Sequence, residues 1–202
     1  MATTNAGKRL EFERLLRRLP AAILDLSAAG AGYAPPREDG ETYADNARVK
    51  ARAAALASGM VALADDSGIE VEALDGAPGV RSARYGGGGL DDAGRVSLLL
   101  ASLAAVAPAR RHAAFVCHLA VAAPDGRIVA ESAARLAGRV AASPRGASGF
   151  GYDPVFEFPA IGATLAELAP GAKDLLSHRG RAAALLLPEL CRIVVDFRSV
   201  AP

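Results

Sequence analysis

The sequence predicts an α/β fold, on three observations. Residues 61–64 form an apolar run of the kind found in a strand that is buried on both faces. Leucine and phenylalanine recur at helical spacing between residues 8 and 19. Two apolar stretches, residues 113–122 and 127–134, flank a Pro-Asp-Gly turn and are typical of a β-hairpin. We therefore expect strands and helices to share one core.

The length and composition are those of a folded chain with one domain, residues 1–202, and room for two lobes. Hydrophobic residues make up 51% of the sequence, which argues against disorder. The net charge of +1 gives no global reason to expect nucleic acid or an acidic membrane as a partner. We expect no membrane anchor, because no apolar run reaches the length of a span. Cys117 and Cys191 lack a metal-ligand spacing, which favours free thiols in a reducing cytoplasm.

In chain order, the first helix is expected from about residue 8, with Thr4 or Asn5 as its cap. A loop over residues 28–40 follows and ends in an acidic cluster. Thr42 then caps a second helix, which we expect to reach residue 57. Further along, the sequence predicts a half-exposed strand over 69–73, a helix over 90–106, the hairpin, and a last helix that begins near Ser177.

The apolar run at 61–64 leads directly into Asp65, Asp66, Ser67 and Gly68, which we interpret as a turn at the end of a strand. Neighbouring carboxylates repel each other and are costly to desolvate. A pair at this place therefore indicates a cation that arrives with a phosphate ester. The alternative is a polar turn without any ligand.

Three further segments are candidate binding elements. The small polar loop before Lys8 leads into a helix N-terminus, which suits a phosphate; the alternative is a plain N-cap beside a solvated lysine. Residues 148–156 place aromatic side chains among glycines, so a planar base could stack there on Phe150 or Tyr152, or the segment is a packing corner. His178 and Arg179 open the last helix, where cations oppose the helix dipole unless an anion binds.

Taken together, these residues and several others form an ordered series along the chain. The series comprises Thr3, Asn5 and Lys8, then Glu38 with Asp39-Gly40, Asn46-Ala47 with Lys50, residues 64–68, 82–85 and 150–154, and Ser177-His178-Arg179-Gly180. It resembles the inosine triphosphate pyrophosphatase family, the house-cleaning dITP/XTP diphosphatases, over nearly the whole chain. The resemblance implies an α/β fold with an elongated, mixed β-sheet flanked by helices, two lobes around a central substrate cleft, and a homodimer.

The resemblance also implies the activity: hydrolysis of inosine, deoxyinosine and xanthosine triphosphates to the monophosphate and pyrophosphate, with Mg²⁺ as cofactor. It assigns Asp66 as the catalytic base and as a metal ligand together with Glu38. It assigns substrate binding to Thr3, Thr4, Asn5, Ala6, Gly7, Lys8, Lys50, Ser67, Phe150, Gly151, Tyr152, Asp153, Lys173, His178 and Arg179. Among these, the resemblance assigns Lys8, Lys50 and Lys173 to binding of the triphosphate. It assigns residues 150–153, together with His178 and Arg179, to binding of the purine.

The chemistry of the substrate suggests how the base is selected. We expect backbone N–H groups around Tyr152 and the side chains of His178 and Arg179 to face the purine 6-oxo group, where an adenine amino group would set donor against donor. Two features depart from the family pattern. Only two residues precede Thr3, so the first strand is expected to be short or truncated, and Thr4 stands where the family has glycine and would be strained if φ were positive.

Two other functions are compatible with the residues. One is a pyrophosphatase for other nucleotides, like the Maf-type proteins that act on dTTP or UTP. The other is a nucleotide-binding or nucleic-acid-binding module without turnover, against which the presence of both Glu38 and Asp66 argues.

Overall fold

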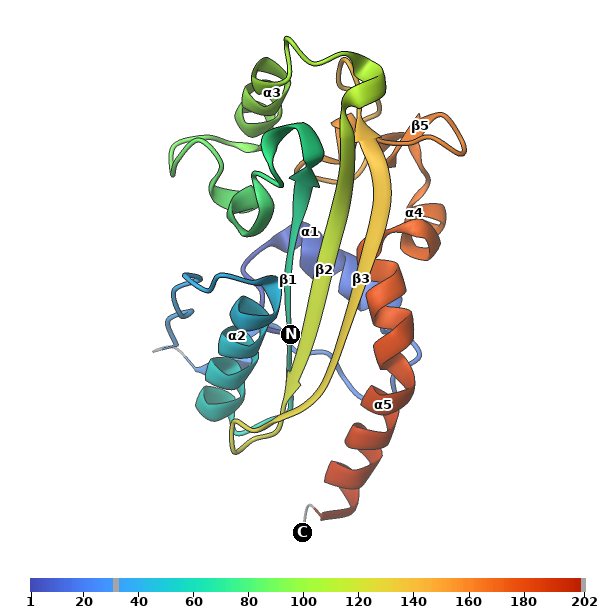
Figure 1. Ribbon diagram of the computed structural model, residues 1–202. Helices are drawn as coiled ribbons and strands as arrows, with labels where there is room; N and C mark the ends of the chain where they lie inside the picture. Colours follow the sequence, from blue (N-terminus) through green and yellow to red (C-terminus); the bar gives the residue numbers. More distant parts are fainter. Residues whose placement is uncertain (31–32, 201–202) are drawn as a thin grey trace. The chain divides into compact units, whose positions relative to one another are not determined.

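The computed structural model describes residues 1–30 and 33–200. The chain forms both α-helices and β-strands, with helices before, between and after the strands, which confirms the α/β class (Figure 1). The helices are α1 (Ala6–Leu15), α2 (Tyr43–Ser58), α3 (Asp92–Ser102), α4 (Pro170–Leu176) and α5 (His178–Val200), and the strands are β1 (Ala62–Val71), β2 (His112–Ala122), β3 (Ile128–Val140), β4 (Phe156–Phe158) and β5 (Ala163–Thr164).

The described strands form one sheet in the order β1-β2-β3-β4-β5. The predicted hairpin is confirmed, because β2 and β3 are neighbours in this order. β4 pairs antiparallel with β3 and with β5, and the arrows of β1 and β2 point in opposite directions in Figure 1. The resemblance implied a mixed sheet, whereas these neighbours run antiparallel.

The largest difference from the expectation lies in β1. The sequence predicts a turn at residues 65–68 between two strands, but β1 runs without interruption from Ala62 to Val71. Aspartate, serine and glycine favour turns where no tertiary contact competes with this local preference. Here Asp65 and Asp66 are 1% and 4% exposed and both are paired with cations, so tertiary contacts override the local preference.

The helix boundaries follow their local signals closely. Asn5 caps α1 by accepting a hydrogen bond from the backbone N–H of Lys8, and Thr42 caps α2 in the same way. α3 is shorter than expected at both ends, because Asp91 caps its start and the helix ends at Ser102 rather than at residue 106. Within the predicted loop 28–40, residues 31–32 lie outside the described residues, and residues 33–40 contain neither helix nor strand.

The chain divides into two compact units, and β1, β2 and β3 each contribute residues to both. The first unit contains residues 1–66, 117–134 and the chain from Arg179 onward. One face of its part of β1 packs through Leu63 against Phe12 of α1, Leu16 directly after α1, and Leu186 of α5. This core holds α1 against the strand that carries the two aspartates.

Alanines make up the contact between α2 and the sheet in the same unit. Ala47, Ala51, Ala54 and Ala55 repeat at helical spacing, are nearly fully buried, and pack with alanines 62, 64, 120 and 122 of β1 and β2. Because alanine has a single side-chain carbon, α2 approaches the sheet closely. The alanine-rich composition therefore brings the polar residues of α2 close to β1.

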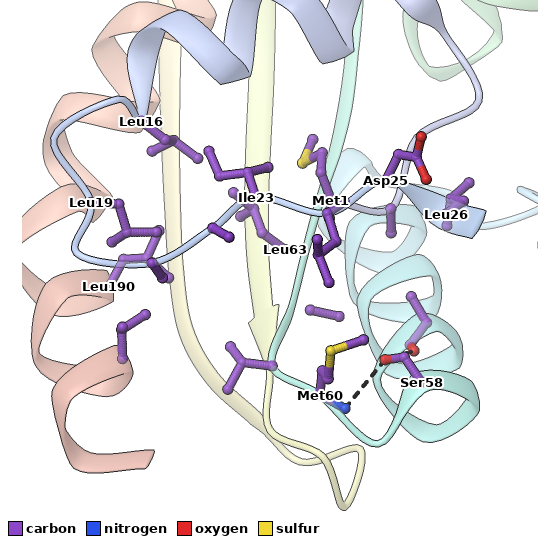
Figure 2. Close-up of a pocket in the computed structure, with 18 residues that line it drawn as sticks. Met1, Leu16, Leu19, Ile23, Asp25, Leu26, Ser58, Met60, Leu63 and Leu190 are labelled. Atoms are coloured by element: carbon purple, nitrogen blue, oxygen red, sulfur yellow. Dashed lines mark hydrogen bonds between the residues drawn. The ribbon is translucent and has the colours of Figure 1, made fainter. Parts of the chain in front are cut away.

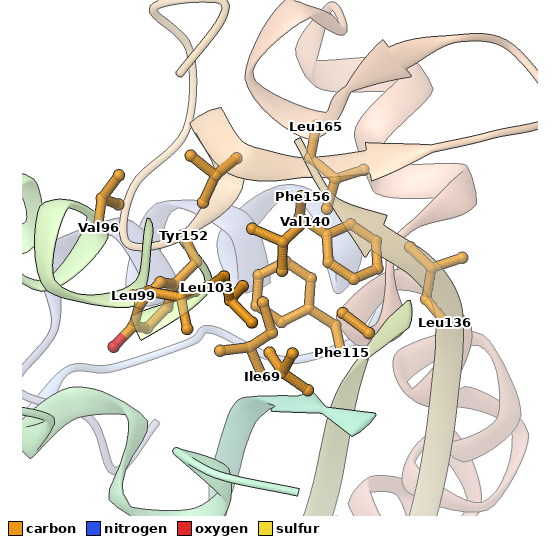
Figure 3. Close-up of a cluster of buried hydrophobic side chains, with 13 residues drawn as sticks. Ile69, Val96, Leu99, Leu103, Phe115, Leu136, Val140, Tyr152, Phe156 and Leu165 are labelled. Atoms are coloured by element: carbon orange, nitrogen blue, oxygen red, sulfur yellow. The ribbon is translucent and has the colours of Figure 1, made fainter. Parts of the chain in front are cut away.

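The second unit, residues 67–116 and 135–178, has its own core (Figure 3). Phe115 of β2 and Phe156 of β4 lie at its centre, with ring centroids 4.4 Å apart. Ile69 of β1 and Leu99 of α3 pack with them, and so does the side chain of Tyr152. This core holds the segment from Phe150 to Phe156 against the sheet.

Figure 2 shows an apolar pocket of about 220 Å³ in the first unit. Met1, Leu16, Ile23, Leu63 and Leu190 line it among others, and none of its described lining residues belongs to the predicted site. An apolar lining does not suit a triphosphate. Among the described helices, none has both the length and the apolar character to cross a membrane.

Candidate functional site

The first cluster of predicted site residues lies in the first unit, around the middle of β1. Successive side chains of a strand point to opposite faces of the sheet. Asp65 contacts Lys8 of α1 and Arg179 of α5, while Asp66 contacts Asn46 and Lys50 of α2. The two neighbouring carboxylates therefore contact different side chains.

Asp65 is held by cations. Its Oδ2 lies 2.8 Å from Lys8 Nζ and 3.9 Å from Arg179 Nε. Burial alone would raise the pKa of Asp65, but the charges of Lys8, Lys50 and Arg179 outweigh it and lower the pKa to about 2. Asp65 is thus a permanently ionised counter-ion.

Asp66 has one partner for each carboxylate oxygen. Lys50 Nζ lies 3.1 Å from Oδ1, and the side-chain amide of Asn46 donates to Oδ2 over 3.1 Å. Burial raises the pKa of Asp66 above its ordinary value, although Lys50 and Lys8 oppose this effect. Neighbouring carboxylates whose pKa values are driven apart are typical of sites where only one of them exchanges protons.

Lys50 joins Asp66 to the acidic loop. Its Nζ also lies 3.2 Å from Glu38 Oε2, so the two predicted metal ligands contact one ammonium group and lie within a few ångströms of each other. Burial works against the charged form of Lys50, but Asp65, Asp66 and Glu38 outweigh it and raise the pKa. Glu38 is more exposed than its partners, with a side-chain exposure of 38%.

These carboxylates fit a hard divalent cation. Magnesium is bound in proteins by one or two carboxylates and keeps oxygen ligands from water or phosphate. Glu38 and Asp66 supply that donor set, although no group of three or more His, Cys, Asp or Glu in the described chain is placed to hold a metal by itself. The remaining ligands would have to come from water and substrate.

The N-terminal segment reaches the same strand. The backbone N–H of Ala2 donates to the carbonyl of Leu63 in β1, and the hydroxyl of Thr3 accepts from the backbone N–H of Asn5. Residues 1–5 form neither helix nor strand, so the predicted first strand is reduced to this contact. Thr4 does not have a positive φ and is therefore not strained in that way, because Asp75 is the only described non-glycine residue with positive φ. Ala6 and Gly7 open α1, where backbone N–H groups lack helical partners.

Arg179 has a partner that the sequence did not indicate. Its Nη1 lies 3.1 Å from Oε2 of Glu11, and both side chains are 6% exposed. Glu11 lies three residues after Lys8 on α1, so both lie on one helix face. That spacing was the only available signal, and a Lys-Glu pair of this kind is ordinarily a surface feature.

A second cluster lies in the second unit. Lys173 Nζ contacts Asp153 Oδ2 over 2.5 Å, and this carboxylate also accepts from the backbone N–H of Phe150. The ammonium group lies 5.0 Å from the centroid of the Phe150 ring. The structure thus brings together three predicted residues from two separate motifs.

The remaining predicted residues of this unit are more deeply placed. The ring of Tyr152 is part of the core and its hydroxyl donates to the carbonyl of Ser82, so Phe150 is the partly exposed ring of this segment. The backbone N–H of Gly151 donates to Asp92. His178 is fully buried and stacks on Phe115, 4.5 Å between ring centroids, a partner that no local sequence signal indicates. Ser67 follows Asp66 on β1 and is partly buried.

Comparison with known proteins gives one consistent result. A dITP/XTP pyrophosphatase of Parasynechococcus marenigrum (strain WH8102) is 46% identical over 190 residues, which cover 94% of this chain and 93% of that protein. A dITP/XTP pyrophosphatase of Mycobacterium tuberculosis (strain H37Rv) is 46% identical over 192 residues, with coverages of 94% and 93%. The solved structure of a HAM1 protein from Coxiella burnetii has a TM-score of 0.84 at 38% identity, and covers 95% of this chain and 96% of its own.

The Ham1 protein of Staphylococcus aureus is similar in structure as well, with a TM-score of 0.81 at 35% identity and coverages of 94% and 95%. The model of the Ham1 family matches residues 1–189, which include every residue of both clusters. The chain therefore belongs to the Ham1 family.

Proposed function

We propose that this protein hydrolyses the deaminated purine nucleotides ITP, dITP and XTP to the nucleoside monophosphate and pyrophosphate, and so keeps them out of DNA and RNA. Relatives that match nearly the whole chain at 46% identity are named dITP/XTP pyrophosphatases. The observation that carries the proposal is the group of Glu38, Lys50 and Asp66, in which two carboxylates with different exposure share one buried lysine.

In this reaction a water oxygen attacks the α-phosphorus, and the bond from that phosphorus to the bridging oxygen of the leaving pyrophosphate breaks. Asp66 takes the proton of the attacking water, for which its raised pKa makes it a better base than Asp65. Lys8 and Lys50 bind the phosphate oxygens. Both lysines are already paired with carboxylates, so a bound triphosphate replaces or joins existing ion pairs.

Glu38 and Asp66 are proposed to hold Mg²⁺. When bound, the ion draws negative charge off the phosphate oxygens. The exposure of Glu38 and its position on a loop suit a ligand that meets a substrate-bound ion. Thr3, Asn5 and the first turn of α1 offer further donors for phosphate oxygens.

The residues from Phe150 to Asp153, with His178 and Arg179, are proposed to recognise the purine. Phe150 offers a ring and the backbone around Tyr152 offers N–H groups, with Asp153 fixing this segment through the N–H of Phe150, while Lys173 is proposed to bind the triphosphate. His178 and Arg179 supply side-chain donors for the 6-oxo group. Because an adenine amino group cannot accept from these donors, ATP is rejected.

The assembly and the location are proposed on the family resemblance and on the two free cysteines. The protein acts as a homodimer in the cytoplasm, where Cys117 and Cys191 stay reduced. Neither nucleic acid nor a membrane is a partner, in keeping with the net charge of +1.

Pyrophosphate release from a nucleotide panel tests the proposal. The panel contains ITP, dITP, XTP, GTP, ATP, dTTP and UTP, each with Mg²⁺ and with EDTA, and orthophosphate is measured in parallel. We expect kcat/KM for ITP to exceed that for ATP by at least about 100-fold, and turnover to require Mg²⁺. Orthophosphate as the product, equal use of ATP, or a preference for dTTP or UTP would contradict the proposal.

A further inference from the structure

Asn46 connects the two proposed metal ligands and has no role assigned so far. It lies near the start of α2 and is 1% exposed. Its Nδ2 donates to Asp66 Oδ2 over 3.1 Å, and its Oδ1 accepts from the backbone N–H of Gly40 over 2.9 Å. Gly40 lies two residues after Glu38 on the acidic loop, so one side-chain amide contacts both the base and the loop.

The chemistry of an amide suits this place. A carboxylate that takes a proton from water needs a fixed plane and must keep its charge. Lys50 fixes one oxygen of Asp66, and a neutral N–H donor fixes the other without adding a second positive charge. An amide also has an acceptor at its other end, which the loop N–H requires.

The backbone of the loop is adapted to the same contact. A Cβ atom at Gly40 would lie 2.8 Å from Asn46 Oδ1 and 2.8 Å from Asp45 Cβ. Any larger residue at position 40 would therefore displace Asn46 or the loop. Two positions of the sequence, 40 and 46, thus serve one arrangement.

We propose that Asn46 is a positioning residue of the reaction, which holds the Asp66 carboxylate and the Glu38 loop in one fixed arrangement. This inference rests on the proposed function and goes beyond it, because Asn46 acts through Asp66 and Glu38 rather than on the substrate. Loss of such a supporting hydrogen bond typically lowers activity 10–100-fold.

Steady-state kinetics with ITP at saturating Mg²⁺ separates positioning from binding. Asn46→Ala removes both contacts, Gly40→Ala displaces the amide, and Asn46→Asp keeps the acceptor for Gly40 but sets a carboxylate against Asp66. We expect kcat to fall about 10–100-fold in all three variants, with KM for ITP within about threefold of the wild type. Val49→Asp is the matched control, since it adds the same charge to an exposed position of α2 and should leave kcat unchanged.

A spectroscopic readout is independent of turnover. The sequence contains two asparagines and no glutamine, so the side-chain amides of Asn5 and Asn46 are its only carboxamide signals in a ¹⁵N–¹H spectrum. We expect the Asn46 pair to exchange slowly with solvent and to shift in Asp66→Ala. The exposed Asn5 pair should stay in place.

The outcomes are distinguishable. A wild-type protein that releases no pyrophosphate from ITP overturns the proposed function and this inference with it. Wild-type turnover combined with Asn46→Ala or Gly40→Ala kcat values within twofold of the wild type overturns the inference alone. A raised KM at unchanged kcat assigns Asn46 to substrate binding and overturns it as well, as does an Asn46 amide that exchanges as fast as that of Asn5.

Discussion

Replacing Asp65 by asparagine tests whether this carboxylate stabilises the fold rather than the reaction. Asp65 is 1% exposed, and its pKa is lowered from the ordinary 3.8 to about 2. That difference corresponds to about 2 kcal/mol of stabilisation of the ionised form. Asp65→Asn also leaves the partly buried Lys8 and the buried Arg179 with one counter-ion fewer. We expect the free energy of unfolding at pH 7 to fall by about 2–4 kcal/mol, or the Tm by roughly 5–15 °C.

The pH dependence of this loss has a definite sign. The stabilisation from a carboxyl with a lowered folded-state pKa is complete above its unfolded-state pKa and disappears as the pH falls through the folded-state value. The difference between the wild type and Asp65→Asn should therefore be constant above about pH 4 and shrink toward about pH 2. Urea unfolding in EDTA, followed by circular dichroism at several pH values, measures it.

Asp66→Asn is the matched control, because the neighbouring carboxylate has the opposite pKa shift. Burial raises the pKa of Asp66, so its ionised form costs stability at neutral pH, and the neutral amide removes that cost. We expect Asp66→Asn to be at least as stable as the wild type at pH 7. Equal losses in the two variants, or an Asp65→Asn protein that is as stable as the wild type, would refute the separation of the two carboxylates.

Three further predictions concern packing and reactivity. Ala51 is fully buried between α2 and the sheet, so Ala51→Leu should lower the free energy of unfolding by about 1–3 kcal/mol. Ala57→Leu on the exposed face of α2 should change it little, and urea unfolding of both variants measures the difference. A Cβ atom at Gly138 would lie 2.5 Å from the carbonyl oxygen of Glu157, so Gly138→Ala should lose about 2 kcal/mol or more in the same assay, and unchanged stability would contradict this packing. Burial raises the pKa of the Cys117 thiol, so a thiol reagent at pH 8 should label Cys191 in the native protein and both cysteines in urea; rapid native labelling of Cys117 would contradict its burial.

Features with local sequence signals were predicted well. The caps of α1 and α2 and the hairpin between β2 and β3 depend on a few neighbouring residues, and the structure confirms them. β3 extends to Val140, six residues beyond the predicted end, where Arg139 and Val140 pair with β4. No pattern within β3 itself could reveal this neighbour.

The site shows the same limit more clearly. The residue types pointed to cations around two carboxylates, but the sequence placed both at the end of a strand. Which cations each carboxylate contacts depends on the alternation of side chains along β1. It turns Asp65 toward Lys8 and Arg179, and Asp66 toward α2. These partners come from positions up to 114 residues away. Glu11 left only its spacing to Lys8 as a signal, and nothing near Asn46 in the sequence indicates that its amide contacts Asp66.

Turnover of ITP by Asp66→Asn at saturating Mg²⁺, measured as pyrophosphate release, tests the central claim most directly. Asp66 is the proposed base, so we predict a kcat at least about 100-fold below the wild type in a protein that unfolds at the same temperature or higher. A kcat within tenfold of the wild type, in a protein folded to the same extent, would contradict the role of Asp66 and the account built on it.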